Sequence, residues 1–286
     1  MRRFPDKWLC ALAACLLTWM HLPRVADGKS LAGLRVSLSP TTLQAFERYV
    51  TVIDAENNRN LGEANFLWVD RLPGKEKEEA YAALKRGEIE MRRVPAGSAG
   101  ANAEIPGGMI HDWKGIVFIP GAKLDQVLRA LEDYDHHATI YAPEVEKAKI
   151  EKREGNHYVV FLRFRRTKVV TVVLDTEHDV NYYRDSPTRA HSRSSAIRIA
   201  EVENPDGPDE KEKTPGEDQG FLWKMETWWR LQEKDGGVYV ENHVVSLTRD
   251  LPTGLGWLIE PFITSIPKES LEFTLGATRK AVLNAK

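Results

Sequence analysis

The C-terminal part of the chain places the strongest constraint on the fold. A β-patterned run from Val238 to Leu247 leads through the corner Thr248 to Pro252 into a long helical tail, residues 267–283. One face of that tail carries an apolar stripe at helical spacing, made of Leu271, Leu275, Thr278 and Val282. Such a stripe must be buried against another element. We therefore expect a curved sheet folded around the helix, with an apolar cavity between the two.

A regular order of elements precedes this tail. Residues 113–119 are patterned as a strand, and an amphipathic helix follows with Leu124, Val127, Leu128 and Leu131 on one face. Beyond an irregular stretch, turn signals separate six candidate strands. They cover residues 145–152, 157–165, 168–174, 191–202, 221–231 and 238–247. For the third of these, a continuation to residue 183 is left open. The predicted fold class is α+β, with a curved seven-stranded antiparallel sheet wrapped around a long C-terminal helix.

Residues 29–108 form a mostly helical N-terminal extension with a linker. Apolar residues recur at spacings of three and four from Leu38 to about Ile53, after a capping signal at Ser39. A second, strongly charged helix is expected over residues 75–86, with Gly87 placed to end it. Ile89 and Met91 alternate with polar neighbours as in a short strand, and small and turn-forming residues from 95 to 108 predict a loop. The predicted domain boundary therefore lies between residues 108 and 109.

The first 28 residues have the pattern of a secretory signal peptide. A basic start is followed by an apolar run from Trp8 to Leu22 and by the small-residue triplet Ala26 to Gly28. We expect the protein to be exported, to the periplasm or the medium. Two alternatives stay open, an uncleaved anchor and a lipoprotein modified at Cys15. For the anchor, the apolar run is shorter than the roughly twenty residues that span a bilayer. Both cysteines, Cys10 and Cys15, lie in this leader, so a mature chain would contain no disulfide and no thiol.

Composition excludes some classes of partner. The formal net charge is −2 and no basic face is evident, so nucleic acid is not expected as a partner. Phosphate-binding glycine loops, nucleophile elbows and zinc-binding spacings are absent from the sequence, so we expect no metal and no cofactor. Residues 205–220 are dominated by Pro, Asp, Glu, Lys and Gly, which predicts a long solvated hairpin tip.

Two segments give the sequence a resemblance to a known superfamily. They are the opening IHDWKGIVFIPGAKLDQVLRALEDYD and the closing VYVENHVVSLTRDLPTGLGWLIEPFITSIPKESLEFTLGATRKAV. Together with the order of elements, they resemble the START-like superfamily, also called the helix-grip or polyketide cyclase and lipid-transfer superfamily. The resemblance covers roughly residues 109–286 and does not extend to residues 29–108. It implies a deep cavity between the long helix and the sheet that binds a lipid, sterol, isoprenoid or aromatic molecule, and it carries no catalytic residue over to this chain.

Strand alternation indicates which side chains would line that cavity. In residues 221–231 one face carries Phe221, Trp223, Met225, Thr227, Trp229 and Leu231, and the opposite face carries Leu222, Lys224, Glu226, Trp228 and Arg230. We expect the first set to face inward. In residues 157–165 both faces are partly apolar, and we place Tyr158, Val160, Leu162 and Phe164 inward. The predicted ligand-binding residues are Trp223, Met225, Thr227, Trp229, Tyr158, Tyr182, Leu271 and Leu275, with solid core packing as the alternative for these rings.

Polar residues near the expected strand ends and cavity mouth are candidates for specific contacts. Residues 182–184 and 188–193 concentrate hydroxyl, guanidinium and imidazole groups that could fix a carboxylate or phosphate, unless they simply lie in water at a strand end. Asp133, Asp135, His136 and His137 follow the first helix of the second domain and are raw material for acid and base chemistry. Adjacent histidines do not share a helix face, however, so a structural role is the simpler interpretation.

Three functions remain open from the sequence. The leading hypothesis is an exported protein that binds or transfers a hydrophobic or amphipathic small molecule, with peripheral membrane contact for ligand exchange. The second is a cyclase-like or hydrolytic enzyme that uses Asp135, His136 or Tyr182 in the same cavity. The third is an assembly module in which residues 29–108 bind a protein partner.

Overall fold

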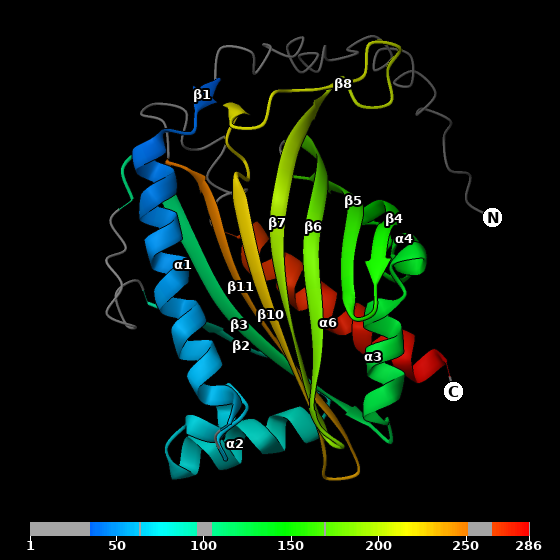
Figure 1. The fold of residues 1–286 in the computed structure, drawn as a ribbon. Helices are drawn as coiled ribbons and strands as arrows, with labels where there is room; N and C mark the ends of the chain where they lie inside the picture. Colours follow the sequence, from blue (N-terminus) through cyan, green and yellow to red (C-terminus); the bar gives the residue numbers. More distant parts are fainter. Residues whose placement is uncertain (1–34, 63, 96–104, 169, 251–264, 286) are drawn as a thin grey trace, which may run out of the picture. The chain divides into compact units, whose positions relative to one another are not determined.

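The alternating strands of the second half of the chain pair into one antiparallel sheet (Figure 1). A computed structural model describes residues 35–62, 64–95, 105–168, 170–250 and 265–285. The predicted signal peptide with Cys10 and Cys15, and residues 96–104 of the predicted linker, lie outside the described residues. The helices are α1 (Pro40–Leu61), η2 (Trp68–Arg71), α2 (Gly74–Lys85), α3 (Leu124–Glu132), η3 (Tyr134–His136), α4 (His137–Ile140) and α6 (Ile266–Asn284).

The main sheet has the strand order β2-β3-β11-β10-β7-β6-β5-β4. Its strands are β2 (Glu90–Arg93), β3 (Gly108–Pro120), β4 (Val145–Glu154), β5 (His157–Thr167), β6 (Thr171–Ser186), β7 (Arg189–Glu203), β10 (Lys224–Lys234) and β11 (Gly237–Arg249). The short strand β8 (Lys211–Glu212) pairs with β7, while β1 (Val36–Ser37) and β9 (Glu217–Asp218) form a separate pair. This α+β architecture confirms the predicted helix-grip fold.

The predicted count of seven strands is too low, because the sheet has nine. All seven expected strands are present, and β6 continues without a break through residue 183 to Ser186. The two additions are β2, which pairs with residues 113–116 of β3, and the two-residue strand β8. The alternation at Ile89 and Met91 predicted β2 as a short strand, but not its pairing with β3. The two residues of β8 carry too few alternating positions to be recognised from their sequence.

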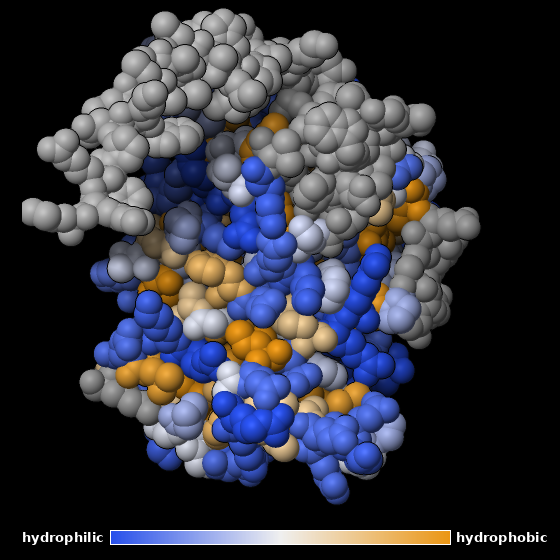
Figure 2. Space-filling model, turned by 180° about the vertical axis from the view of Figure 1, so that it is seen from behind, coloured by the Kyte–Doolittle hydropathy of each residue, from blue (hydrophilic) through white to orange (hydrophobic). Residues whose placement is uncertain are grey.

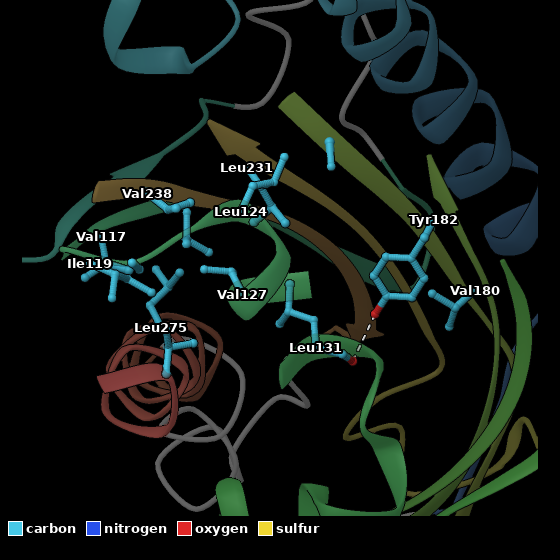
Figure 3. Close-up of a cluster of buried hydrophobic side chains, with 14 of the residues drawn as sticks. Val117, Ile119, Leu124, Val127, Leu131, Val180, Tyr182, Leu231, Val238 and Leu275 are labelled. Carbon is cyan, nitrogen blue, oxygen red and sulfur yellow. Dashed lines mark hydrogen bonds between the residues drawn. The ribbon is translucent and has the colours of Figure 1, made fainter. Parts of the chain in front are cut away.

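The C-terminal helix packs its predicted stripe into the inner face of the sheet. Leu271, Leu275, Thr278 and Val282 are the buried residues of α6, as expected. Leu275 points toward Val117 and Ile119 of β3, beside the apolar face of α3 (Figure 3). A close approach occurs at Gly115, where an added Cβ would lie 2.6 Å from Leu275 Cδ1. A residue without a side chain at this point of β3 therefore allows α6 to sit directly on the sheet.

The N-terminal helix covers the opposite face of the sheet. It begins as predicted, because the Ser39 hydroxyl accepts a hydrogen bond from the Thr42 amide at 3.1 Å. It ends at Leu61 rather than near residue 53, because the polar run after Ile53 continues the helix without an apolar pattern. Its buried face, Phe46, Tyr49 and Ile53, packs against side chains of the strands β10 and β11, namely Trp228, Val245 and Leu247. The second helix, α2, ends as expected before Gly87, whose φ is +93°.

Residues on both sides of the predicted domain boundary thus contribute to one sheet and its two faces. The boundary between residues 108 and 109 itself stays a prediction. The hairpin prediction for residues 205–220 needs a correction at its C-terminal end, because Asp218 and Gln219 are buried. The Asp218 carboxylate accepts hydrogen bonds from the Gly220 amide at 2.7 Å and from Trp223 Nε1 at 3.0 Å, which ties this end to the sheet. Within the described part of the chain, no helix is long and apolar enough to cross a membrane.

We predict that Leu275→Ala lowers the free energy of unfolding by about 2–5 kcal/mol, since it leaves a void between α6 and the sheet. Leu275 is fully buried, whereas Leu283 on the same helix is 37% exposed. The matched change Leu283→Ala should therefore alter stability by about 0.5 kcal/mol or less. Urea denaturation of both variants provides the measurement, and equal losses would contradict the proposed grip.

Candidate functional site

A cavity of about 290 Å³ lies between the inner face of the sheet and the helices η3, α4 and α6. This volume is close to the lower end of the range for small-molecule sites, about 300–1,000 Å³. Strands β5 and β6 supply a mostly apolar wall, which includes Val160, Leu162, Phe164, Val172, Leu174 and Val180. Helix α6 contributes Leu271 and Phe273 from the other side. The site is therefore a hollow lined mainly by hydrocarbon.

Seven of the eight predicted ligand-binding residues line the cavity or lie in the core beside it, and the eighth, Trp223, lies elsewhere. Met225, Thr227, Trp229, Tyr182 and Leu271 line the cavity. Tyr158 and Leu275 belong to the adjoining solid core, together with Val117, Val127 and Leu231. Figure 3 shows Leu275 and Tyr182 among the side chains of this core. The inward placement of Val160, Leu162 and Phe164 is confirmed, since all three line the cavity.

Trp223 lies in a different place from the predicted one. It packs with α1 residues Phe46 and Tyr49 in the cluster on the opposite face of the sheet. Strand β10 begins only at Lys224, so the alternation that we extended back to residue 221 does not apply to Trp223. Trp228 lies on the face opposite to the cavity, as predicted. It is buried there under α1, and its Nε1 donates to Asp54 at 2.6 Å.

Two tyrosine hydroxyls form a buried hydrogen-bonded pair at one end of the cavity. The Tyr134 and Tyr182 hydroxyl oxygens are 2.8 Å apart, and Tyr182 donates to the Leu131 carbonyl at 3.0 Å (Figure 3). Burial raises the pKa of both phenols well above the ordinary value. Both hydroxyls therefore stay protonated at neutral pH and act as hydrogen-bonding groups.

Two histidines line the cavity in their neutral form. Burial lowers the pKa of His137 and of His178 to about 4 in each case. The His137 ring lies between Tyr134 and Tyr141, with centroid distances of 4.5 and 4.8 Å, and its Nε2 is buried with no hydrogen-bond partner among the described residues. His178 Nε2 lies 2.9 Å from the Thr176 hydroxyl. Neither imidazole supplies a positive charge for an anionic ligand at neutral pH.

Charged side chains reach the cavity where the end of β5 meets α6. Glu144, Arg165 and Arg166 are part of the lining. Arg166 forms ion pairs with Glu144 and with Glu269 of α6, the latter at 3.0 Å. Burial raises the pKa of Glu144, although the neighbouring Arg166 opposes that shift. These charges already have partners of opposite sign, so this end links α6 to the sheet through paired ions.

The other polar candidates lie outside the cavity lining. His136 is exposed and its Nδ1 pairs with Asp133 at 2.7 Å, while the Asp135 carboxylate accepts from the Ile150 amide at 3.0 Å. In the 188–193 segment, His191 stacks on Tyr183 and pairs with Asp185. Arg193 pairs with Asp54 of α1 on the opposite face of the sheet. Among the described residues, no group of three or more His, Cys, Asp or Glu side chains could hold a metal ion.

Sequence reasoning missed Asn242, His178 and Phe273 as lining residues. The signal for Asn242 was present, because alternation along β11 places it on the same face as Val244 and Ser246. His178 and Phe273 gave no such signal. His178 is one of several single histidines, and the predicted helix stripe did not include Phe273.

Comparisons with known proteins give likeness in structure only. No protein-family model and no curated protein matches the sequence. The structure is similar to a STAR-related lipid transfer protein from Xanthomonas axonopodis, at 16% identity and TM-score 0.42 over 66% of this chain and 98% of that one. It is also similar to the Zhui aromatase/cyclase from a Streptomyces species, at 16% identity and TM-score 0.41 over 61% and 94%. A START superfamily protein from Mycobacterium smegmatis has 12% identity and TM-score 0.38 over 61% and 99%.

One of these structures is itself named as a START superfamily protein, the superfamily that the sequence resembles. The helix-grip fold itself follows from the strand order and from the packing of α6 against β3, described above.

We predict that the neutral state of His178 makes stability depend on pH. In the unfolded chain His178 binds a proton below its ordinary pKa of 6.5, but in the folded chain only near pH 4. Its contribution to stability is therefore complete above pH 6.5 and is lost as the pH falls toward 4. The variant His178→Gln should reduce the dependence of the unfolding free energy on pH in this window by up to about 1.4 kcal/mol per pH unit. Urea denaturation between pH 4 and 8 tests this, and parallel curves for variant and wild type throughout would contradict it.

Proposed function

We propose that this protein binds and transfers a hydrophobic or amphipathic small molecule. The observation that carries the proposal is the cavity of about 290 Å³ between α6 and the sheet, with its mostly apolar lining. Burial of apolar ligand surface contributes about 2.5 kcal/mol per 100 Å² before the costs of association. A lipid, isoprenoid or aromatic molecule of matching size would gain enough from this burial to bind.

Flexible and aromatic side chains make this lining suitable for a bulky ligand. Met225 and Trp229 present a polarisable thioether and a large ring on the sheet side, and Phe273 of α6 also lines the cavity. The alternative of solid core packing applies to Tyr158 and Leu275, which belong to the core cluster and do not line the cavity.

The enzyme hypothesis has less support from the geometry. Of its three candidate acid or base groups, Asp135 and His136 are outside the cavity lining, and only Tyr182 is part of it. Burial raises the pKa of Tyr182 well above its usual value, and its hydroxyl already donates to a backbone carbonyl. A phenol held in this way suits hydrogen bonding better than proton transfer at neutral pH.

Export remains part of the proposal and is supported by the pattern of residues 1–28. Removal of this segment would give a mature chain that begins near residue 29. N-terminal sequencing of the protein from its native source tests this expectation. A chain that still begins at Met1, or one that begins at Cys15 with a lipid attached, would contradict cleavage near residue 28.

We predict that filling the cavity abolishes ligand binding and leaves the fold intact. Solvent extraction of the purified protein should release an apolar molecule, and the extracted protein should bind the neutral dye N-phenyl-1-naphthylamine with saturation. Thr227→Trp places a large ring into the hollow and should weaken dye binding at least about tenfold. The matched control Thr51→Trp lies on an exposed position of α1 and should bind the dye as wild type does.

The readouts are dye fluorescence for binding and circular dichroism for folding. Equal dye binding by wild type and Thr227→Trp would place the binding site elsewhere. A protein that yields no extractable apolar molecule and binds no dye would contradict the proposed function.

A further inference from the structure

One row of side chains crosses the inner face of the sheet and combines polar groups with an aromatic ring. Tyr182 on β6 is directly opposite Ser192 on β7, which is opposite Trp229 on β10. Trp229 is in turn opposite Asn242 on β11, which is opposite Gly115 on β3. Residues opposite one another on paired strands share a face of the sheet. This row therefore lies on the same face as α6, whose Leu271 and Leu275 approach the sheet closely at Gly115.

Two polar atoms in this row are buried without a hydrogen-bond partner among the described residues. They are Asn242 Oδ1 and Ser192 Oγ, on residues that are 3% and 1% exposed. They flank Trp229, so they lie about two strand spacings apart, roughly 10 Å. Buried polar groups in folded proteins are nearly always paired, and an unpaired one reduces stability. Asn242 lines the cavity, so a bound molecule can supply the partner that the protein does not.

The neighbouring lining on this side is polar but uncharged. Ser194, Thr227 and Ser246, from the same three strands, add hydroxyl groups to the cavity wall. The charged lining residues are far away along the sheet. Arg166 is opposite Val172 on β6, ten residues before Tyr182, which corresponds to roughly 33 Å along an extended strand. No cation among the described lining residues is therefore close to the row.

An anionic group placed at the row would lose its hydration without gaining a counter-ion, which is strongly unfavourable. A pure hydrocarbon would leave Asn242 Oδ1 unpaired. A hydroxyl group avoids both costs, because it can donate to this oxygen and carries no charge.

We propose that the ligand is an uncharged, hydroxylated apolar molecule whose hydroxyl group donates a hydrogen bond to Asn242 Oδ1 beside Trp229. This inference rests on the proposed function and specifies its ligand class. It separates neutral alcohols and phenols from fatty acids and other anions. Asn242 accordingly selects the ligand, while the apolar wall supplies most of the affinity.

Three matched probes test the proposal on the full chain after lipid extraction: naphthalene, 1-naphthol and 1-naphthoate. Isothermal titration calorimetry at pH 7 should show 1-naphthol binding roughly 2- to 10-fold more tightly than naphthalene, which corresponds to one neutral hydrogen bond. The anion 1-naphthoate should bind most weakly. If naphthalene or 1-naphthoate binds as tightly as 1-naphthol, this inference is overturned and the proposed function stands. If none of the three binds, both are overturned.

The variant Asn242→Leu should lose the preference for 1-naphthol and keep its affinity for naphthalene. Its melting temperature should stay equal or rise, because the change removes an unpaired polar atom; a purely structural role for Asn242 predicts a lower value. The matched control is Asn181→Leu. Asn181 is the neighbour of Tyr182 on the other face of β6, where it donates to Asp179 at 3.1 Å. This change should leave the affinities for all three probes unchanged.

A measurement on the wild type keeps the test independent of how Asn242→Leu folds. The side-chain amide resonances of Asn242 should shift in NMR spectra when 1-naphthol binds and should shift much less with naphthalene. Equal shifts with both probes would contradict a hydrogen bond at this position.

Discussion

The packing of one helix face against a curved sheet is the constraint on which the rest of this structure depends. Leu271, Leu275, Thr278 and Val282 form the buried stripe of α6, and residues on the inner face of the sheet cover most of it. The absence of a side chain at Gly115 lets Leu271 and Leu275 approach the sheet directly. The cavity lies between this helix and side chains of β5, β6, β10 and β11.

The opposite face of the sheet is closed by the N-terminal helix, and its interior is unusually polar. Asp112 accepts hydrogen bonds from the Tyr49 hydroxyl at 2.8 Å and from His243 Nε2 at 2.7 Å, and Asn57 of α1 lies 3.2 Å from His243 Nδ1. Each buried group here satisfies another, which fixes the position of α1 on the sheet. The row around Asn242 contrasts with this layer, since Asn242 Oδ1 and Ser192 Oγ lack such partners within the described residues. On the side seen in Figure 2, apolar residues reach the surface as separate patches among hydrophilic ones.

Ion pairs and apolar burial have different roles around the cavity. Arg166 joins Glu144 to Glu269 and so links the start of α6 to the end of β5. These partly exposed pairs add only modest stability. The apolar wall of β5 and β6 bounds most of the cavity, and the neutral histidines His137 and His178 add no charge to its lining.

The sequence by itself determined the elements, their order and the buried stripe of α6, because strand alternation and helical spacing are local patterns that burial imposes directly on neighbouring residues. The same patterns placed Met225, Thr227 and Trp229 on the cavity side. Only the tertiary structure decided that Trp223 and Trp228 face α1, because the chain leaves its alternation before Lys224 and because a second helix covers the far face. It alone also decided which polar groups find partners. Asn242 and His243 are adjacent in sequence. Asn242 Oδ1 faces the cavity without a partner among the described residues, whereas His243 is hydrogen-bonded beneath α1, since pairing depends on residues far apart in the chain.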